Sequence, residues 1–293
     1  MRLDPETVAL VALLRLGRRS WGEYARQVER ACSATTVLTR ELGIDPGQTT
    51  LFGDDTARLA RATAELHEWL AGGIRLLTVL DDEYPRNLRE VLNRPPVVFV
   101  AGCLGEAEDC SIAMIGSRRA SPEGIELAEA LSAEFVASGY TVISGLAAGI
   151  DAAAHRSALR QGGQTVAVLG TGLAHCYPRE NAALQRTIAE QGAVVSQFWP
   201  ESPPQPGNFL MRNEVMSGLS RGSVIVEASE RSGARAQARL ALAHGRPVFL
   251  LQGLLAQAWA RELASRDGVH VVCSAKEVIA AVETGPGGER ARQ

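Results

Sequence analysis

Lysine is almost absent from this chain of 293 residues. Lys276 is the only one, so 29 of the 30 basic residues are arginine. Because Lys276 follows Ser274 and Ala275 near the C-terminus, the chain has no Gly-Lys-Ser/Thr phosphate loop of the Walker type. An enzyme that forms a Schiff base would have one candidate lysine. The composition therefore argues against both classes of site.

Paired cysteines and long apolar runs are also missing. The odd number of cysteines and the lack of any CxxC pattern indicate neither a disulfide framework nor a zinc knuckle, and we expect buried, inert thiols at Cys32, Cys103, Cys110, Cys176 and Cys273. The longest apolar runs, such as 165–169, have the length of a strand, far short of a membrane span. The N-terminus lacks a signal-peptide pattern. We expect a cytoplasmic protein that does not contact membranes.

The chain also has no excess of positive charge. The chain has 30 Lys and Arg against 33 Asp and Glu, which gives a net charge of −3 and no basic tail. A protein of this kind does not attract nucleic acid through its overall field. Any anion-binding site must therefore be local.

The first third of the chain has apolar residues at helical spacing. We expect a small helical domain over 1–72, with a helix at 56–70 that ends at Gly72-Gly73 and a turn at Asp45-Pro46-Gly47. Its arginines could contact DNA, but a solvated helix face is the favoured interpretation. No residue there indicates chemistry.

From residue 73 onward, apolar strand-like runs alternate with amphipathic helices. This alternation predicts an α/β domain over 73–283, with a doubly wound parallel sheet covered on both faces. The expected strands are 111–115, 141–143, 165–169, 193–195, 223–226, 247–251 and 269–272, and the expected helices are 122–138, 150–160, 181–191, 234–244, 256–264 and 275–283. The glycine-rich, charged tail at 284–293 is expected to be disordered.

Four loops of small residues follow the predicted strands, at 116–119, 144–149, 170–172 and 227–233. Ligands of such sheets bind beyond the carboxyl ends of the strands, where glycine permits close approach and helix N-termini attract anions. Arg118 comes just before a helix start marked by Ser121 and Pro122, where a phosphate would lie. Pairing of Arg118 with a surface carboxylate is an equally good interpretation.

Three other patterns resemble known functional motifs, but the residues around them do not fit those motifs. Gly170-Thr171-Gly172 lacks the third glycine of a dinucleotide fingerprint, which argues against NAD. The G-x-S-x-G match at 218–222 follows a helix and precedes a strand, the reverse of a nucleophile elbow. Asp151 and His155 share a helix face but have no third metal ligand, so we expect Asp151 to cap or pair within the rim and His155 to be packed.

The segment 207–213 follows a proline-rich loop and is too polar for a strand. It contains an aromatic ring, a guanidinium and an amide within five residues. Aromatic rings stack on bases and arginines hold phosphates, which favours single-stranded nucleic acid as the ligand. Alternatively, Phe209 only fixes a loop to the core.

Taken in order, these loops resemble the DNA-processing protein A family (DprA, also called Smf) over about residues 73–253. The matching stretches are GIRLLTVLDDEYPRNLREVLNRPPVVFVAG, AMIGSRRAS, VISGLAAGIDAAAHRSAL, TVAVLGTG, CYPRENAAL, NFLMRN, VIVEASERSGA and GRPVF. The order and spacing of GSR, SGLAxGIDxxAH, GTG, YPREN and RN are specific, although no single piece is.

The resemblance implies an extended Rossmann-like domain with a mainly parallel sheet, often preceded by a helical domain. It implies a dimer that binds single-stranded DNA without catalysis or cofactor, protects incoming strands and loads the RecA recombinase during natural transformation. By motif, Gly116, Ser117 and Arg118 would hold backbone phosphate, and Arg179 would add a basic contact. Phe209, Arg212 and Asn213 would line the same groove. The backbone that can approach the DNA closely would come from Ser144, Gly145, Gly170, Gly172, Ser232 and Gly233.

The chain departs from the family at several places. Glu214 stands where the family usually has arginine, and an acidic side chain beside the groove should weaken phosphate binding. The run 232–237 is also altered, and we expect no winged-helix domain after Glu283. The alternative function is a nucleotide sensor or a nucleotide glycosidase that uses Arg118 and Glu227. The P-G-G-x-G-T-x-x-E motif of such glycosidases is absent.

Overall fold

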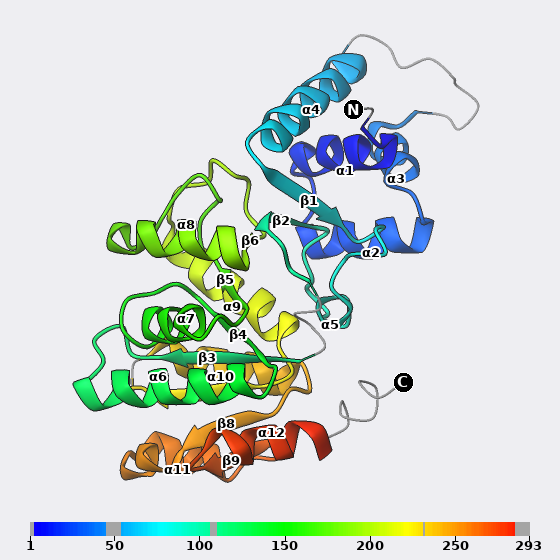
Figure 1. Cartoon of the computed structure of the whole chain (residues 1–293). Coiled ribbons are helices and arrows are strands. Elements are labelled where there is room, and N and C mark those ends of the chain that lie inside the picture. The colour runs from blue at the N-terminus through cyan, green and yellow to red at the C-terminus, as the bar shows by residue number, and fades with distance from the viewer. Residues whose placement is uncertain (1–2, 45–53, 106–109, 231, 285–293) are drawn as a thin grey trace. The chain divides into compact units, whose positions relative to one another are not determined.

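The computed structural model describes residues 3–44, 54–105, 110–230 and 232–284. These residues form two compact units (Figure 1). The first unit comprises residues up to 84 together with 92–98, and the second comprises 85–91 and 99 onward. The expected turn at 45–47 and the expected disordered tail beyond Thr284 lie outside the described residues.

In the first unit, the described residues form four helices and a strand: α1 (Pro5–Leu16), α2 (Trp21–Ala31), α3 (Ala34–Leu42), α4 (Asp54–Ala71) and β1 (Ile74–Thr78). Side chains of Asp4, Ser20 and Ser33 cap the first three helices at their N-termini. The unit extends beyond the expected boundary at 72. Tyr84 is fully buried and its hydroxyl donates to the Pro95 carbonyl at 2.6 Å, which joins segment 92–98 to this unit.

In the second unit, strands and helices alternate along the chain. The elements are α5 (Arg86–Arg89), β2 (Val97–Gly102, which begins in the first unit), β3 (Ser111–Gly116), α6 (Pro122–Ala137), β4 (Thr141–Ser144), α7 (Ile150–Arg160), β5 (Thr165–Val168), the 3₁₀ helix η1 (Arg179–Asn181), α8 (Ala182–Gln191), β6 (Ala193–Ser196), α9 (Pro206–Leu219), β7 (Ser223–Glu227), α10 (Gly233–Ala243), β8 (Val248–Leu251), the 3₁₀ helix η2 (Gln252–Ala256), α11 (Ala258–Ala264), β9 (Val269–Val272) and α12 (Ala275–Thr284).

The strands of this unit lie in the order β2-β6-β5-β4-β3-β7-β8-β9. β2 is antiparallel to β6, and the other neighbours pair in parallel. The chain builds outward from β3 to β4, β5 and β6 on one side, and to β7, β8 and β9 on the other. The predicted doubly wound, mainly parallel Rossmann-like sheet is therefore confirmed, and its order reverses between β3 and β7.

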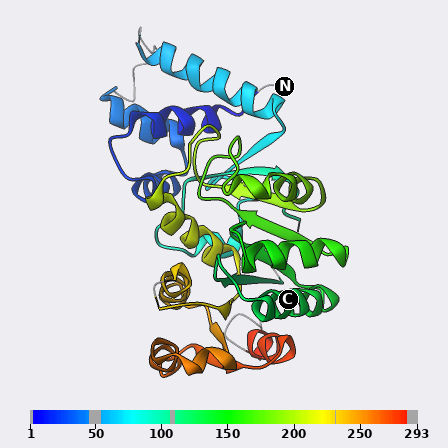
Figure 2. The same cartoon turned by 90° about the vertical axis from the view of Figure 1, so that its left-hand side faces the viewer.

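Helices cover both faces of this sheet (Figure 2). α6, α7 and α12 pack on one face, and α9 and α10 pack on the other. Alternate residues of β3 and its neighbours, including Ile112, Met114 and Val142, belong to the core cluster that contains Phe135 of α6. The strands are buried on both sides, which explains their continuous apolar runs.

Two interpretations of local structure are wrong. Phe209 does not fix a loop, because α9 begins at Pro206, where proline is well suited to a first helical turn. The cysteines are not buried: Cys32, Cys103 and Cys273 are exposed and the other two are half-buried, since each lies at or beyond the end of an element. Among the described residues, no helix is both long enough and apolar enough to cross a membrane.

Candidate nucleic-acid interface

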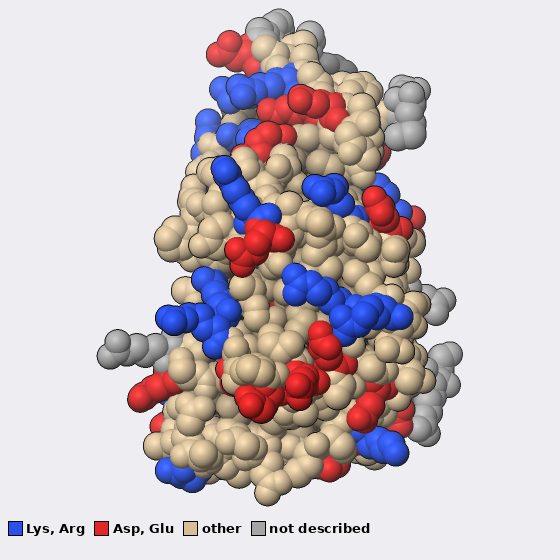
Figure 3. Space-filling view, turned by 60° about the vertical axis from the view of Figure 1, so that its left-hand side comes forward, with Lys and Arg blue, Asp and Glu red and all other residues tan. Residues whose placement is uncertain are grey.

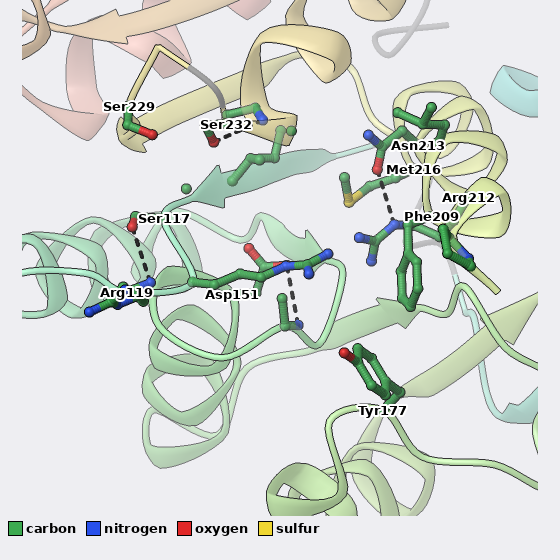
Figure 4. A pocket seen from close by; sticks show the side chains of 18 residues that line it. Ser117, Arg119, Asp151, Tyr177, Phe209, Arg212, Asn213, Met216, Ser229 and Ser232 are labelled. Carbon is green, nitrogen blue, oxygen red and sulfur yellow. Dashed lines mark hydrogen bonds between the residues drawn. The ribbon is translucent and has the colours of Figure 1, made fainter. Parts of the chain in front are cut away.

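A cavity of about 750 Å³ opens at the carboxyl ends of β3, β4 and β7. Its walls are the loop after β3, the start of α7, the loop that leads into α10, and one side of α9 (Figure 4). This is the place where the strand order reverses, and a doubly wound sheet forms its ligand crevice there.

The structure brings eight of the predicted site residues together around this cavity. They are Gly116, Ser117, Arg118, Phe209, Arg212, Asn213, Ser232 and Gly233. The other five do not line it. Gly145 lines a smaller adjoining cavity, whereas the remaining four are absent from both linings, namely Ser144, Gly170, Gly172 and Arg179.

The loop after β3 is held in place by its own hydrogen bonds and by β7. Ser117 Oγ accepts the Arg119 N–H at 3.1 Å, and the Ser117 N–H donates to the Glu227 carbonyl at 2.7 Å. The Glu227 carboxylate accepts from both the N–H and the hydroxyl of Ser121, the residue that caps α6. Glu227 thus serves the loop and does not line the cavity, which removes the acid that the glycosidase alternative needs.

Arg118 lies exposed at the cavity mouth. Its guanidinium carbon is 5.4 Å from the ring centroid of Phe209, which in turn is 5.4 Å from that of Tyr177. Arg118 forms no ion pair with any residue that the structure describes, so the surface-carboxylate interpretation is not supported. The exposed guanidinium and the two rings form one wall of the cavity.

Phe209 is both fixed and accessible. It is half-buried, and a Cβ on Gly170 would lie 2.6 Å from Phe209 Cδ1, so the glycine makes room for the ring. Phe209 therefore packs against the end of β5 and also lines the cavity, and its stacking on bases stays a prediction.

Arg212 is buried beneath the cavity. Its Nη1 donates to the carbonyls of Gly145 at 2.6 Å and Val168 at 2.9 Å, and its Nε donates to Asn213 Oδ1 at 3.1 Å. A Cβ at Gly145 would lie 1.7 Å from that Nη1. Arg212 therefore links α9 to the ends of β4 and β5, and Gly145 is small to admit its guanidinium. These bonds hold the side chain in the floor, away from the cavity mouth.

Asp151 and His155 have the structural roles expected of them. Asp151 accepts the N–H groups of Gly145 and Ala147 at 3.2 and 3.3 Å, and burial raises the pKa of its carboxyl while Arg212 opposes that rise. His155 Nδ1 is 2.7 Å from Thr165 Oγ1, and burial lowers the pKa of its ring to about 3, so the ring is neutral. No group of three His, Cys, Asp or Glu within the described ranges could hold a metal.

The remaining predicted residues serve the scaffold or lie outside the cavity. The Ser144 hydroxyl donates to the Met114 carbonyl at 2.6 Å. A Cβ at Gly172 would lie 2.0 Å from the Trp199 carbonyl oxygen, so this glycine accommodates a neighbouring loop. Arg179 is exposed on η1. Glu214 is half-buried and is absent from the cavity lining, and its effect on phosphate binding beside the groove stays a prediction.

Several residues that the sequence did not single out belong to the site. Tyr177, Arg119, Met216 and Ser229 line the cavity. Gly149 does not line it but controls its shape, because a Cβ there would lie 2.2 Å from the Ser117 carbonyl oxygen. The tyrosine stands in the YPREN stretch and the glycine in SGLAAGID, so the motifs contained both residues.

Charge on the surface is distributed unevenly. On the face shown in Figure 3, Lys and Arg side chains gather in a band and Asp and Glu side chains gather below it. The net charge of −3 therefore coexists with a locally basic surface, as a local anion site requires.

Gly233 permits a direct test of close backbone approach. It is the first residue of α10, lines the cavity, and has nothing within 4 Å of the position of an added Cβ. We expect Gly233→Ala to raise the free energy of unfolding by about 0.4–1 kcal/mol and to weaken binding of an oligonucleotide. Urea unfolding and a binding titration measure both quantities. Unchanged affinity would mean that no ligand approaches Gly233.

Comparison with known proteins identifies the family of this chain. The family model for DNA recombination-mediator protein A matches residues 75–283. The chain belongs to the DNA recombination-mediator protein A family. Relatives in the family include DNA processing protein DprA of Streptococcus pneumoniae, 35% identical over 70% of this chain and 73% of that protein. Protein Smf of Synechocystis is 41% identical over 60% of this chain, and the match spans 46% of its length.

Solved structures of the family have the same fold. The structure of DprA from Streptococcus pneumoniae matches with a TM-score of 0.71 and 26% identity, over 96% of this chain and 98% of that one. DNA processing protein A from Helicobacter pylori, a structure described for its single-stranded DNA binding mode, matches with a TM-score of 0.63 and 26% identity. That match covers 71% of this chain and 95% of the other.

Proposed function

We propose that this chain binds single-stranded DNA at the cavity between β3 and β7, without catalysis and without a cofactor. The supporting observation is the wall formed by the exposed Arg118 guanidinium, Phe209 and Tyr177 beside the loops that lead into α6 and α10. A guanidinium grips phosphate oxygens, and aromatic rings stack on bases of any sequence. The Helicobacter pylori relative, described for binding single-stranded DNA, supports the same ligand.

The wider role that we propose follows the family resemblance. The protein would act in the cytoplasm as a dimer, protect incoming single strands and load the RecA recombinase during natural transformation. Among the described residues that line the cavity, none presents a nucleophile next to a base, because Asp151 is bound to backbone N–H groups and His155 lies outside the lining. This arrangement supports a binding role rather than a hydrolytic one.

The test is the binding of fluorescent oligo(dT) at several salt concentrations to the wild type and to Arg118→Ala. We expect the substitution to weaken binding about tenfold for all sequences, since a charged hydrogen bond is lost. The slope of log K against log salt should fall by about 0.7, the value for one phosphate contact on a single strand.

Arg160→Ala is the matched control. Arg160 is an exposed arginine of α7 that pairs with Glu129 at 2.9 Å and lies outside the cavity lining. It should leave affinity and salt slope unchanged. If the wild type ignores oligo(dT) at low salt but binds a mononucleotide, the nucleotide-sensor alternative replaces the present proposal.

A further inference from the structure

A second basic surface lies outside the cavity, on α10, α11 and the turn that follows α11. A shallow hollow there is lined by Arg235, Arg239, Trp259, Glu262, Leu263 and Arg266. Three guanidinium groups thus surround one carboxylate. In a chain with an overall negative charge, this is a local excess of positive charge.

The arginines of this second basic surface are poorly neutralised. Arg239 forms no ion pair with any described residue, and Arg266 reaches Glu262 only at 4.0 Å. Arg235 and Arg239 are four residues apart on one helix, and like charges at that spacing destabilise a helix. This arrangement therefore lowers the stability of the protein without ligand, and a bound anion would relieve the repulsion between the arginines.

Arg235 is held ready by its neighbours. Its guanidinium carbon is 5.6 Å from the ring centroid of Trp259, and its Nη1 donates to the Glu230 carbonyl at 2.9 Å. The Trp259 indole N–H donates to Gln257 Oε1 at 2.6 Å, and Gln257 Nε2 donates to the Ala228 carbonyl at 2.7 Å. An ordered guanidinium loses less side-chain entropy when it binds a ligand.

The second basic surface is continuous with the cavity along the chain. Ser232, Gly233 and Ala234 line the cavity, and Arg235 is the next residue of α10. Ala228, which fixes Gln257 and through it Trp259, directly precedes the cavity residue Ser229. Arg239 lies four residues, or about 6 Å along the helix axis, beyond Arg235. A strand that leaves the cavity past the start of α10 would meet these arginines in succession.

We propose that Arg235, Arg239 and Arg266 bind the phosphodiester backbone of single-stranded DNA beyond the nucleotides held in the cavity. This inference rests on the proposed function, because the same strand occupies both places. Arginine suits the task because its planar fork grips two phosphate oxygens, and repeated phosphates match a row of guanidinium groups.

The test compares short and long oligo(dT), of about 6 and about 24 nucleotides, since one site takes about 4–16. The variant Arg239→Ala/Arg266→Ala spares Arg235, whose contacts fix the surface. We expect it to bind the short oligonucleotide like the wild type and the long one about tenfold more weakly. Its salt slope for the long oligonucleotide should fall by about 1.4, for two lost phosphate contacts.

The double variant Arg160→Ala/Arg186→Ala is the matched control, because it removes the same charge from residues outside both hollows. It should leave both oligonucleotides bound as in the wild type. Equal loss of short and long binding in the test variant would show that it acts through the cavity, and this would overturn the proposal.

Two further outcomes would also overturn it. If the test variant binds the long oligonucleotide like the wild type but loses binding of polyglutamate, the surface takes an acidic peptide instead. If the wild type binds neither oligonucleotide, the proposed function itself fails. Arg239→Glu provides a check on folding, because an acid four residues after Arg235 should raise the melting temperature while it weakens only the long oligonucleotide.

Discussion

Replacing Arg212 by methionine should lower the free energy of unfolding by about 3–5 kcal/mol, the largest effect of any single change considered for this protein. The substitution removes the donor of two buried carbonyls, those of Gly145 and Val168. A buried acceptor that loses its partner costs about 1–3 kcal/mol. It also leaves the buried Asp151 carboxyl without the positive charge that opposes the rise of its pKa.

Urea unfolding followed by circular dichroism measures this loss. Arg186→Met is the control, because Arg186 is exposed on α8 and a surface change of this kind costs within about 0.5 kcal/mol. Arg212→Met/Asp151→Asn should be less destabilised than the sum of its single variants, since the uncompensated charge is gone. Strict additivity would mean that the two side chains do not interact. A loss below about 1 kcal/mol for Arg212→Met would contradict the structural role assigned to this arginine.

Gly149→Ala should both destabilise the fold and weaken binding of oligo(dT). Gly149 has φ 76° and ψ −125°, a backbone conformation that is essentially restricted to glycine. The added Cβ would lie 2.2 Å from the Ser117 carbonyl oxygen and 3.0 Å from the Arg118 carbonyl carbon, both of which are backbone atoms. We expect a loss of at least about 2 kcal/mol in the free energy of unfolding.

The affinity of Gly149→Ala for oligo(dT) should also fall, because the loop after β3 must shift and Arg118 must move with it. Gly207→Ala is the matched control: Gly207 is in the first turn of α9, and nothing lies within 4 Å of its added Cβ. Unfolding and anisotropy titrations on the two variants separate a strained backbone from a general effect of glycine removal. Wild-type affinity in a folded Gly149→Ala protein would contradict the position assigned to Arg118.

Glycines show most clearly how far the sequence could predict the site. Their placement after strands correctly indicated that other atoms come close to the backbone there. It did not indicate which atoms these are. Gly145 admits the Arg212 guanidinium, Gly170 admits the Phe209 ring, and Gly172 admits the loop at Trp199. A missing side chain leaves space without specifying its occupant. All three glycines were therefore expected to let the protein backbone approach a bound ligand.

Residues 207–213 show that the sequence also could not predict where each side chain points. The sequence identified an aromatic ring, a guanidinium and an amide close together, and the structure places all three at the cavity. It did not predict that the segment is helical, so that Phe209 extends toward Tyr177 while Arg212 turns into the floor. Spacing on a helix decides which side chains share a face, and that face became known only with the packing of α9.

The sequence by itself determined the alternation of strands and helices, the parallel sheet, and the set of loops at one of its edges. These features depend on local periodicity and on turn residues, which are present in any short window of the chain. Only the tertiary structure decided that the loops after β3 and β7 meet at the reversal of strand order, that Glu227 binds Ser121 at the start of α6, and that Arg235 belongs to a basic surface beyond the cavity. Each of these depends on contacts between residues distant in the chain, and long-range packing sets such contacts.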